Sequence, residues 1–143
     1  MERVVLLNKK GLSLVEVMIA LVVLLLVSLA LMQTALVSID SNMNNLLRDE
    51  ALSIAEEWVI GARNIPFDNL TANSLNQAAT GNNAATNPVT IIRNFRNIAN
   101  QNFIVTSVVT DRGIDNKQVG VTVAWAWKGQ PFNHNMSSIV RRP

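Results

Sequence analysis

Residues 12–32 read LSLVEVMIALVVLLLVSLALM, and 18 of these 21 positions are apolar. The three polar ones are Ser13, Glu16 and Ser28. Because an α-helix rises about 1.5 Å per residue, the run is roughly 30 Å long, which matches the hydrocarbon core of a bilayer. We therefore expect one membrane-spanning helix. The remainder, roughly 110 residues, suffices for one small domain.

A short basic stretch precedes the apolar run. Lys9 and Lys10 lie on its N-terminal side, whereas the first charges beyond its other end are Asp40 and Arg48. The positive-inside rule predicts a cytoplasmic N-terminus, with the C-terminal domain outside. The run is about twice as long as the apolar region of a secretory signal peptide, and no small-x-small cleavage site closes it, so we expect it to stay in the membrane.

The cysteine count limits the chemistry of the chain. The 143 residues include no Cys and one His, which excludes a disulfide framework, a thiolate zinc site and a cysteine nucleophile. The acids are scattered apart from the adjacent pairs Asp49/Glu50 and Glu56/Glu57. We expect no metal and no cofactor.

The charges divide the chain into two halves of opposite sign. Residues 12–68 hold seven acids and two bases, and residues 89–143 hold seven bases and two acids. Opposed halves favour self-association or docking of a partner over nonspecific nucleic-acid binding, which needs one strongly basic face.

Glu16 is an ionisable group about one turn into the apolar run. A carboxylate near the bilayer centre costs on the order of 2.5 kcal/mol or more, so an acid in this position is a functional candidate. The alternative is a side chain shallow enough to reach the interface.

The sequence around Glu16 resembles a known signal. Residues 9–21, KKGLSLVEVMIAL, are similar to the class III signal of type IV pilins and type II secretion pseudopilins: a short basic leader, Gly, then an apolar helix with Glu at its fifth position. The resemblance implies that a prepilin peptidase cuts after Gly11 and methylates the new N-terminus, Leu12. The family most often has Phe at that position.

The resemblance also implies a role for Glu16. Cleavage places an amino terminus, a cation, at the start of an apolar helix, and a buried charge needs a partner. In the family, this Glu faces the N-terminal amine of a neighbouring subunit and sets the axial register of the fibre.

The helical pattern continues beyond the membrane segment. Nine apolar residues recur at three- and four-residue spacing: Met43, Leu46, Leu47, Ala51, Ile54, Ala55, Trp58, Val59 and Ala62. We predict one helix from Leu12 to near Ala62 whose second half packs on a globular layer. Gly61 and Pro66 supply the stop signals. Many pilins have a proline after the spanning segment, but this chain has Gln33 and Thr34, so no proline kink is expected.

The rest of the chain predicts a loop followed by strands. Residues 64–88 are rich in Asn, Ala and Thr and are interpreted as a connecting loop. Residues 89–143 contain β-branched runs at 89–94 and 103–110, an alternating run at 119–127 and a last candidate strand at 132–140. The order of helix, loop and antiparallel meander is that of the pilin fold, an α+β arrangement, and the closing strands are most similar to minor pilins of the PilV type.

These patterns divide the chain into five parts. They are a leader (1–11), a transmembrane and assembly half of the helix (12–33), an amphipathic half (34–63), the connecting loop (64–88) and the β-sheet region (89–143).

Several residues carry a weaker signal. Trp58 lies on the apolar stripe, and Trp125 lies with Trp127 on one face of a strand, so core packing is favoured over ligand stacking. Four arginines, Arg93, Arg96, Arg141 and Arg142, do not favour a nucleic-acid site over solvated surface charges. His134 is expected at the surface. Two glycosylation sequons, at Asn69 and Asn135, are interpreted as chance matches.

The function that follows is structural. No nucleophile, phosphate-binding or metalloprotease motif occurs, so we expect a substrate of a processing enzyme and not an enzyme. The favoured hypothesis is a minor type IV pilin in the bacterial inner membrane that joins major and minor pilin subunits through the pilus assembly machinery. A minor pseudopilin of a type II secretion system is the alternative, and a monomeric membrane-anchored binding module is a third.

Overall fold

The computed structural model describes residues 13–81, 87–95 and 98–143. The chain forms two compact units, Met1–Asn42 and Met43–Pro143. A single helix, α1 (Leu14–Asn64), contributes its first part to one unit and its second part to the other. No Pro occurs within α1, and the helix is continuous past Gln33 and Thr34, as predicted.

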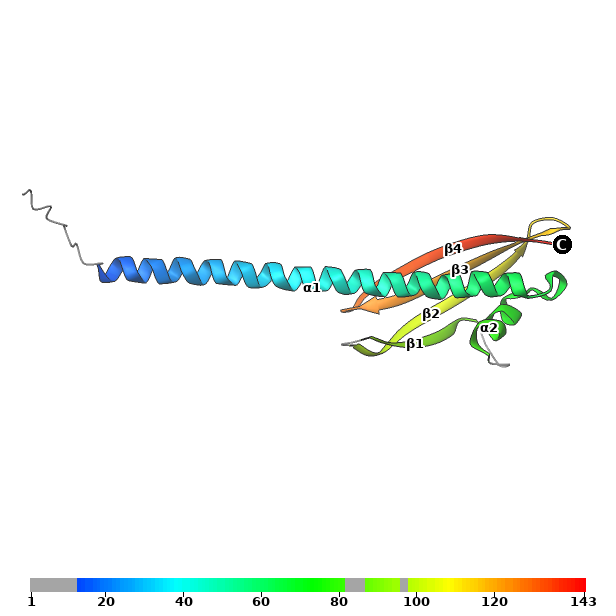
Figure 1. Ribbon diagram of the computed structural model, residues 1–143, viewed down its shortest axis with the longest axis horizontal. Helices are drawn as coiled ribbons and strands as arrows, with labels where there is room; N and C mark the ends of the chain where they lie inside the picture. The colour runs from blue at the N-terminus through cyan, green and yellow to red at the C-terminus, as the bar shows by residue number, and fades with distance from the viewer. Residues whose placement is uncertain (1–12, 82–86, 96–97) are drawn as a thin grey trace, which may run out of the picture. The chain divides into compact units, whose positions relative to one another are not determined.

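The second unit is an antiparallel sheet covered on one face by a helix. Its strands are β1 (Val89–Phe95), β2 (Ile98–Asp111), β3 (Asn116–Trp127) and β4 (Gln130–Arg141). They pair in sequence order as a four-stranded meander. Figure 1 shows the C-terminal part of α1 lying along this sheet. The long N-terminal helix and the α+β, pilin-like arrangement are confirmed, and each strand extends beyond its predicted run.

The core lies between α1 and the inner face of the sheet. On α1 the buried positions follow the predicted stripe: Leu47, Ala51, Ile54, Ala55, Trp58, Val59 and Ala62. On the sheet they alternate with exposed or partly buried residues, as the two-residue period of a strand requires. The main exception on the stripe is Leu46, whose side chain is 44% exposed.

A row of aromatic side chains crosses the inner face. Phe103 pairs with Trp125 across β2 and β3, and Trp125 pairs with Phe132 across β3 and β4. The centroids of the Trp125 and Phe132 rings are 5.8 Å apart and the rings are stacked. Trp125 therefore belongs to the core, as does the fully buried Trp58. The side chain of Trp127 is partly buried and packs against this core.

The prediction of an uninterrupted loop over residues 64–88 is wrong. A 3₁₀ turn, Phe67–Asn69, follows Pro66, and the helix α2 (Ala72–Thr80) comes next. Thr71 caps α2: its hydroxyl accepts from the backbone N–H of Ser74, and the Ser74 hydroxyl accepts from the backbone N–H of Thr71. A capping box normally has Glu or Gln at this third position, so the Thr71-x-x-Ser74 pattern did not indicate a helix. The centre of the predicted loop, residues 82–86, is outside the described residues.

Glycine lies in a turn at one position of the fold and inside a helix at another. Lys128 and Gly129, both with positive φ, connect β3 to β4, and Gln130 and Pro131 already belong to β4. At the end of α1 the stop comes from Pro66, because Gly61 lies inside the helix.

Candidate functional site

The first unit presents the start of α1 and its apolar run. The carbonyl of Ser13 accepts from the N–H of Val17 at 3.1 Å, which is the first hydrogen bond of the helix within residues 13–81. Glu16 lies in the first turn, where the helix dipole favours a negative charge. The predicted processing residues Gly11 and Leu12, and the leader charges Lys9 and Lys10, are outside the described residues.

The apolar side chains from Leu14 to Met32 are exposed in the isolated chain. The most apolar 18-residue window of α1 has a mean hydropathy of 3.0, and none of that window is buried. Ser28 donates its hydroxyl to the carbonyl of Leu24, and Thr34 donates to that of Ala30, so these hydroxyls are satisfied within the helix. By length and composition, this helix can span a membrane.

Glu16 is the one ionisable side chain in this apolar surface among residues 13–39. Its carboxylate is exposed, and no ion pair joins it to another described residue of the same chain. A carboxylate in that setting can accept hydrogen bonds from a cation supplied by another molecule. Sequence reasoning found this residue because the run around it is otherwise free of charge.

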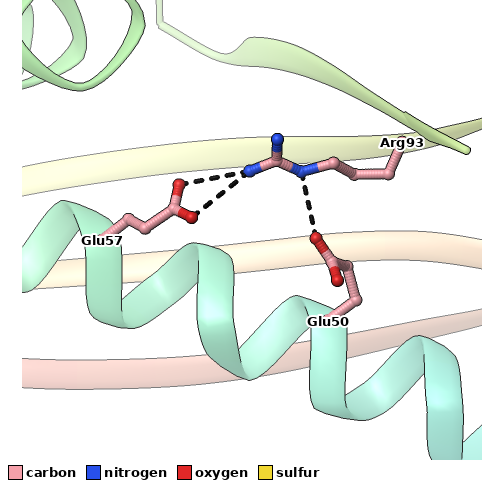
Figure 2. Close-up of polar contacts among 3 residues, drawn as sticks. All are labelled: Glu50, Glu57 and Arg93. Carbon is pink, nitrogen blue, oxygen red and sulfur yellow. Dashed lines mark hydrogen bonds and ion pairs between the residues drawn. The ribbon is translucent and has the colours of Figure 1, made fainter.

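The opposed charges found in the sequence are partly paired within the second unit. Arg93 of β1 places Nε 3.0 Å from Glu50 and Nη2 3.2 Å from Glu57, and both acids lie on α1 (Figure 2). The contact with Glu50 has the distance of an ion pair but not the geometry of a hydrogen bond. This cluster holds the edge strand β1 to the helix.

Arg142 makes a second set of pairs at the end of β4. Its guanidinium donates to the carboxylate of Asp68 at 2.6 Å and lies 4.9 Å from the centroid of the Phe67 ring. Its Nε is 3.8 Å from Asp115. Acids from α1 and the following turn thus pair with Arg93 of β1 and with Arg142, which directly follows β4, in the same chain. Sequence alone did not indicate these pairs.

Three of the four arginines considered for nucleic acid are described by the structure, and these three do not form one patch. Arg93 lies on β1 and Arg141 on β4, at opposite edges of the sheet, and Arg93 and Arg142 are ion-paired. Arg96 is outside the described residues. His134 is half-buried on the inner face of β4, so the prediction of a surface histidine holds in part. Within the described ranges, no three His, Cys, Asp or Glu side chains are grouped so as to hold a metal ion.

A buried polar cluster was missed by sequence reasoning. The Asn76 side chain of α2 accepts from Trp58 of α1 and from Ser107 of β2. No local pattern marks such a residue, because its partners are far away in the chain.

Comparison with known proteins gives one match. Residues 6–32 match the family model for the prokaryotic N-terminal methylation motif. No curated protein and no solved structure matches the chain significantly, and the comparisons contain no evidence for the PilV type. The motif family is structural, and its members are processed by prepilin peptidase and assembled with pilin subunits. Together with the apolar helix that can span a membrane, the motif indicates a type IV pilin-like or pseudopilin precursor.

Proposed function

We propose that this chain is a minor type IV pilin. It is inserted as a single-pass precursor with its N-terminus in the cytoplasm, is cut after Gly11, is methylated at Leu12, and joins other pilins at the tip or in the shaft of a pilus. The observation that carries the proposal is the methylation motif at residues 6–32, which includes the exposed apolar part of α1.

The proposed role of Glu16 is to pair with the amine of Leu12 in a neighbouring subunit. Both charges would otherwise be buried among apolar side chains, where each lacks the solvation it has in water. Exposure of Glu16 within the isolated chain supports this role, because its carboxylate is free to meet a group from outside. The basic pair Lys9 and Lys10 is proposed to hold the leader on the cytoplasmic side before cleavage.

Two measurements on cells test the proposal. Mass spectrometry of the protein from the membrane should give a mature N-terminus at Leu12 carrying one methyl group. An intact N-terminus that retains residues 9–11 would contradict processing and would favour a monomeric anchored module.

The second measurement separates a pilus from a secretion system. Immunolabelling of sheared surface fibres should show that the protein makes up a small fraction of the fibre subunits. Its deletion should lower the number of surface pili or change how they function. Exclusive periplasmic location, with loss of protein secretion on deletion and normal surface pili, would instead identify a minor pseudopilin.

A further inference from the structure

The outer face of the sheet, opposite α1, carries a hollow over β3. It has a volume of about 530 Å³, and its apolar lining comes from Ile104, Ala124, Trp125, Ala126, Pro131 and Phe132. Trp125 and Phe132 direct their side chains to the core, so the floor on the outer face is made by the side chains of Ile104, Ala124 and Ala126. These three side chains alternate with the buried Val105, Val123 and Trp125, so they point away from the core. This volume falls in the range of small-molecule sites.

The cross-strand register explains why the face is hollow there. Ala124 lies between Ile104 of β2 and Asn133 of β4, and Ala126 pairs with Pro131. Both alanine side chains are smaller than those of their cross-strand partners, so β3 leaves space on this face that the larger side chains of β2 and β4 enclose. The floor is apolar at Ile104 and Ala124, where the backbone groups are paired within the sheet, and the carbonyl of Ala126, beyond the end of the β2–β3 ladder, accepts from the Gln101 side chain.

Carboxamides line the rim of the hollow. Asn100, Asn102 and Asn133 are exposed, and their side chains make no hydrogen bond to another described residue. The Gln101 side chain is held in place by donating to the carbonyls of Asn102 and Ala126. Each carboxamide both donates and accepts, and none of the residues that line the hollow carries a charge.

We infer that this hollow is a binding site for a neutral carbohydrate. A pyranose ring has an apolar C–H face that fits a flat aliphatic floor, and its rim of hydroxyl groups both donates and accepts hydrogen bonds, as the carboxamides do. An anionic ligand has no cationic partner among the lining residues. An extended peptide would need free backbone groups, and on the face of a sheet these are already paired.

The inference is independent of the N-terminal motif, because all the lining residues belong to the unit Met43–Pro143. Its test uses the full chain in detergent on an array of uncharged oligosaccharides built from glucose, galactose, mannose and N-acetylglucosamine, alongside sialylated and sulfated glycans. We expect selective binding of one uncharged class.

Two variants and two matched controls locate the binding. Ala124→Leu fills the hollow, and its control Thr122→Leu adds a similar side chain on the same face of β3 outside it. Asn133→Ala removes a rim carboxamide, and its control Asn135→Ala removes one from the same face of β4 outside it. Ala124→Leu and Asn133→Ala should each raise the dissociation constant at least about fivefold, and the two controls should bind as tightly as the unmodified protein.

Unfolding midpoints equal to that of the parent show that a variant is folded. If Ala124→Leu has a lower unfolding midpoint than the unmodified protein, the binding of Asn133→Ala is the test, because that substitution leaves the volume of the floor unchanged. The inference is overturned if no uncharged glycan binds, if charged glycans bind better, or if Ala124→Leu and Asn133→Ala bind as tightly as their controls.

Discussion

The side chain of Asn76 accepts a hydrogen bond from the indole of Trp58, with 3.1 Å between Oδ1 and Nε1, and both side chains are buried. The same oxygen accepts from the hydroxyl of Ser107 at 2.8 Å. One carboxamide thereby joins α2 to the long helix and to the central strand β2. A second side chain supports the same strand, because Asn87 both accepts from and donates to the backbone of Ser107.

Asn76→Ala should destabilise the second unit. The substitution leaves the Trp58 N–H and the Ser107 hydroxyl without this acceptor in the core, and an unsatisfied buried group costs about 1 to 3 kcal/mol. We expect a loss of roughly 1 to 3 kcal/mol in the free energy of unfolding, because the Trp58 N–H loses its acceptor, whereas the Ser107 hydroxyl is also within hydrogen-bond distance of the carbonyl of Ala72. Urea unfolding followed by tryptophan fluorescence measures it. Asn73→Ala, which removes an exposed carboxamide from the same helix, is the control, and equal stability of the two variants would contradict the role of Asn76.

Arg93→Gln should have a small effect that depends on salt. The side chain of Arg93 is 38% exposed and that of Glu57 is 52% exposed, so water screens their interaction. We expect a loss of about 0.5 to 1 kcal/mol at low ionic strength, because partly exposed ion pairs contribute little.

The measurement is a double-mutant cycle with Glu57→Gln. The coupling between the two residues should decrease as salt increases. A coupling that stays constant in high salt would show that these groups interact by packing and not by charge.

Gly11→Val should leave the precursor uncut. The proposal puts the scissile bond directly after Gly11, and a β-branched side chain there hinders close approach of a protease to the backbone. Gly61→Ala is the matched control, because an added Cβ would lie 3.9 Å from Leu75, an ordinary contact. Mass spectrometry of membranes should show full-length protein for the first variant and mature protein for the second. Cleavage of Gly11→Val at the normal rate would argue against this processing site.

Glu16→Val should separate processing from assembly. Valine matches the apolar neighbours of Glu16, so cleavage and membrane insertion should be unchanged, while incorporation into fibres is lost because the neighbouring amine has no partner. Glu16→Asp keeps the charge on a shorter side chain and should recover part of the incorporation. The readout is the ratio of protein in sheared fibres to protein in the membrane. Normal incorporation of Glu16→Val would refute the pairing.

Local periodicity determined most of the architecture. The apolar run over residues 12–32, the stripe that contains Trp58 and the alternation along residues 119–127 are short-range patterns, and each reports which face of a helix or strand is buried. The candidate Glu16 was found in the same way, as a charge that breaks an apolar pattern. The methylation motif is likewise a local feature of consecutive residues.

The tertiary structure decided the features that depend on residues far apart in the chain. The helix α2 lies in a segment whose composition is typical of a loop. Its packing involves the hydrogen bonds that Asn76 accepts from Trp58 and Ser107, which are far from it in the chain. The pairing of Arg93 with Glu50 and Glu57 depends on β1 lying beside α1. The hollow over Ala124 depends on the register that sets Ile104 and Asn133 on either side. Sequence alone determined the buried face of α1 and of β3, because that follows from the period of each backbone. Which elements meet follows from packing, because it depends on side chains brought together only in the folded chain.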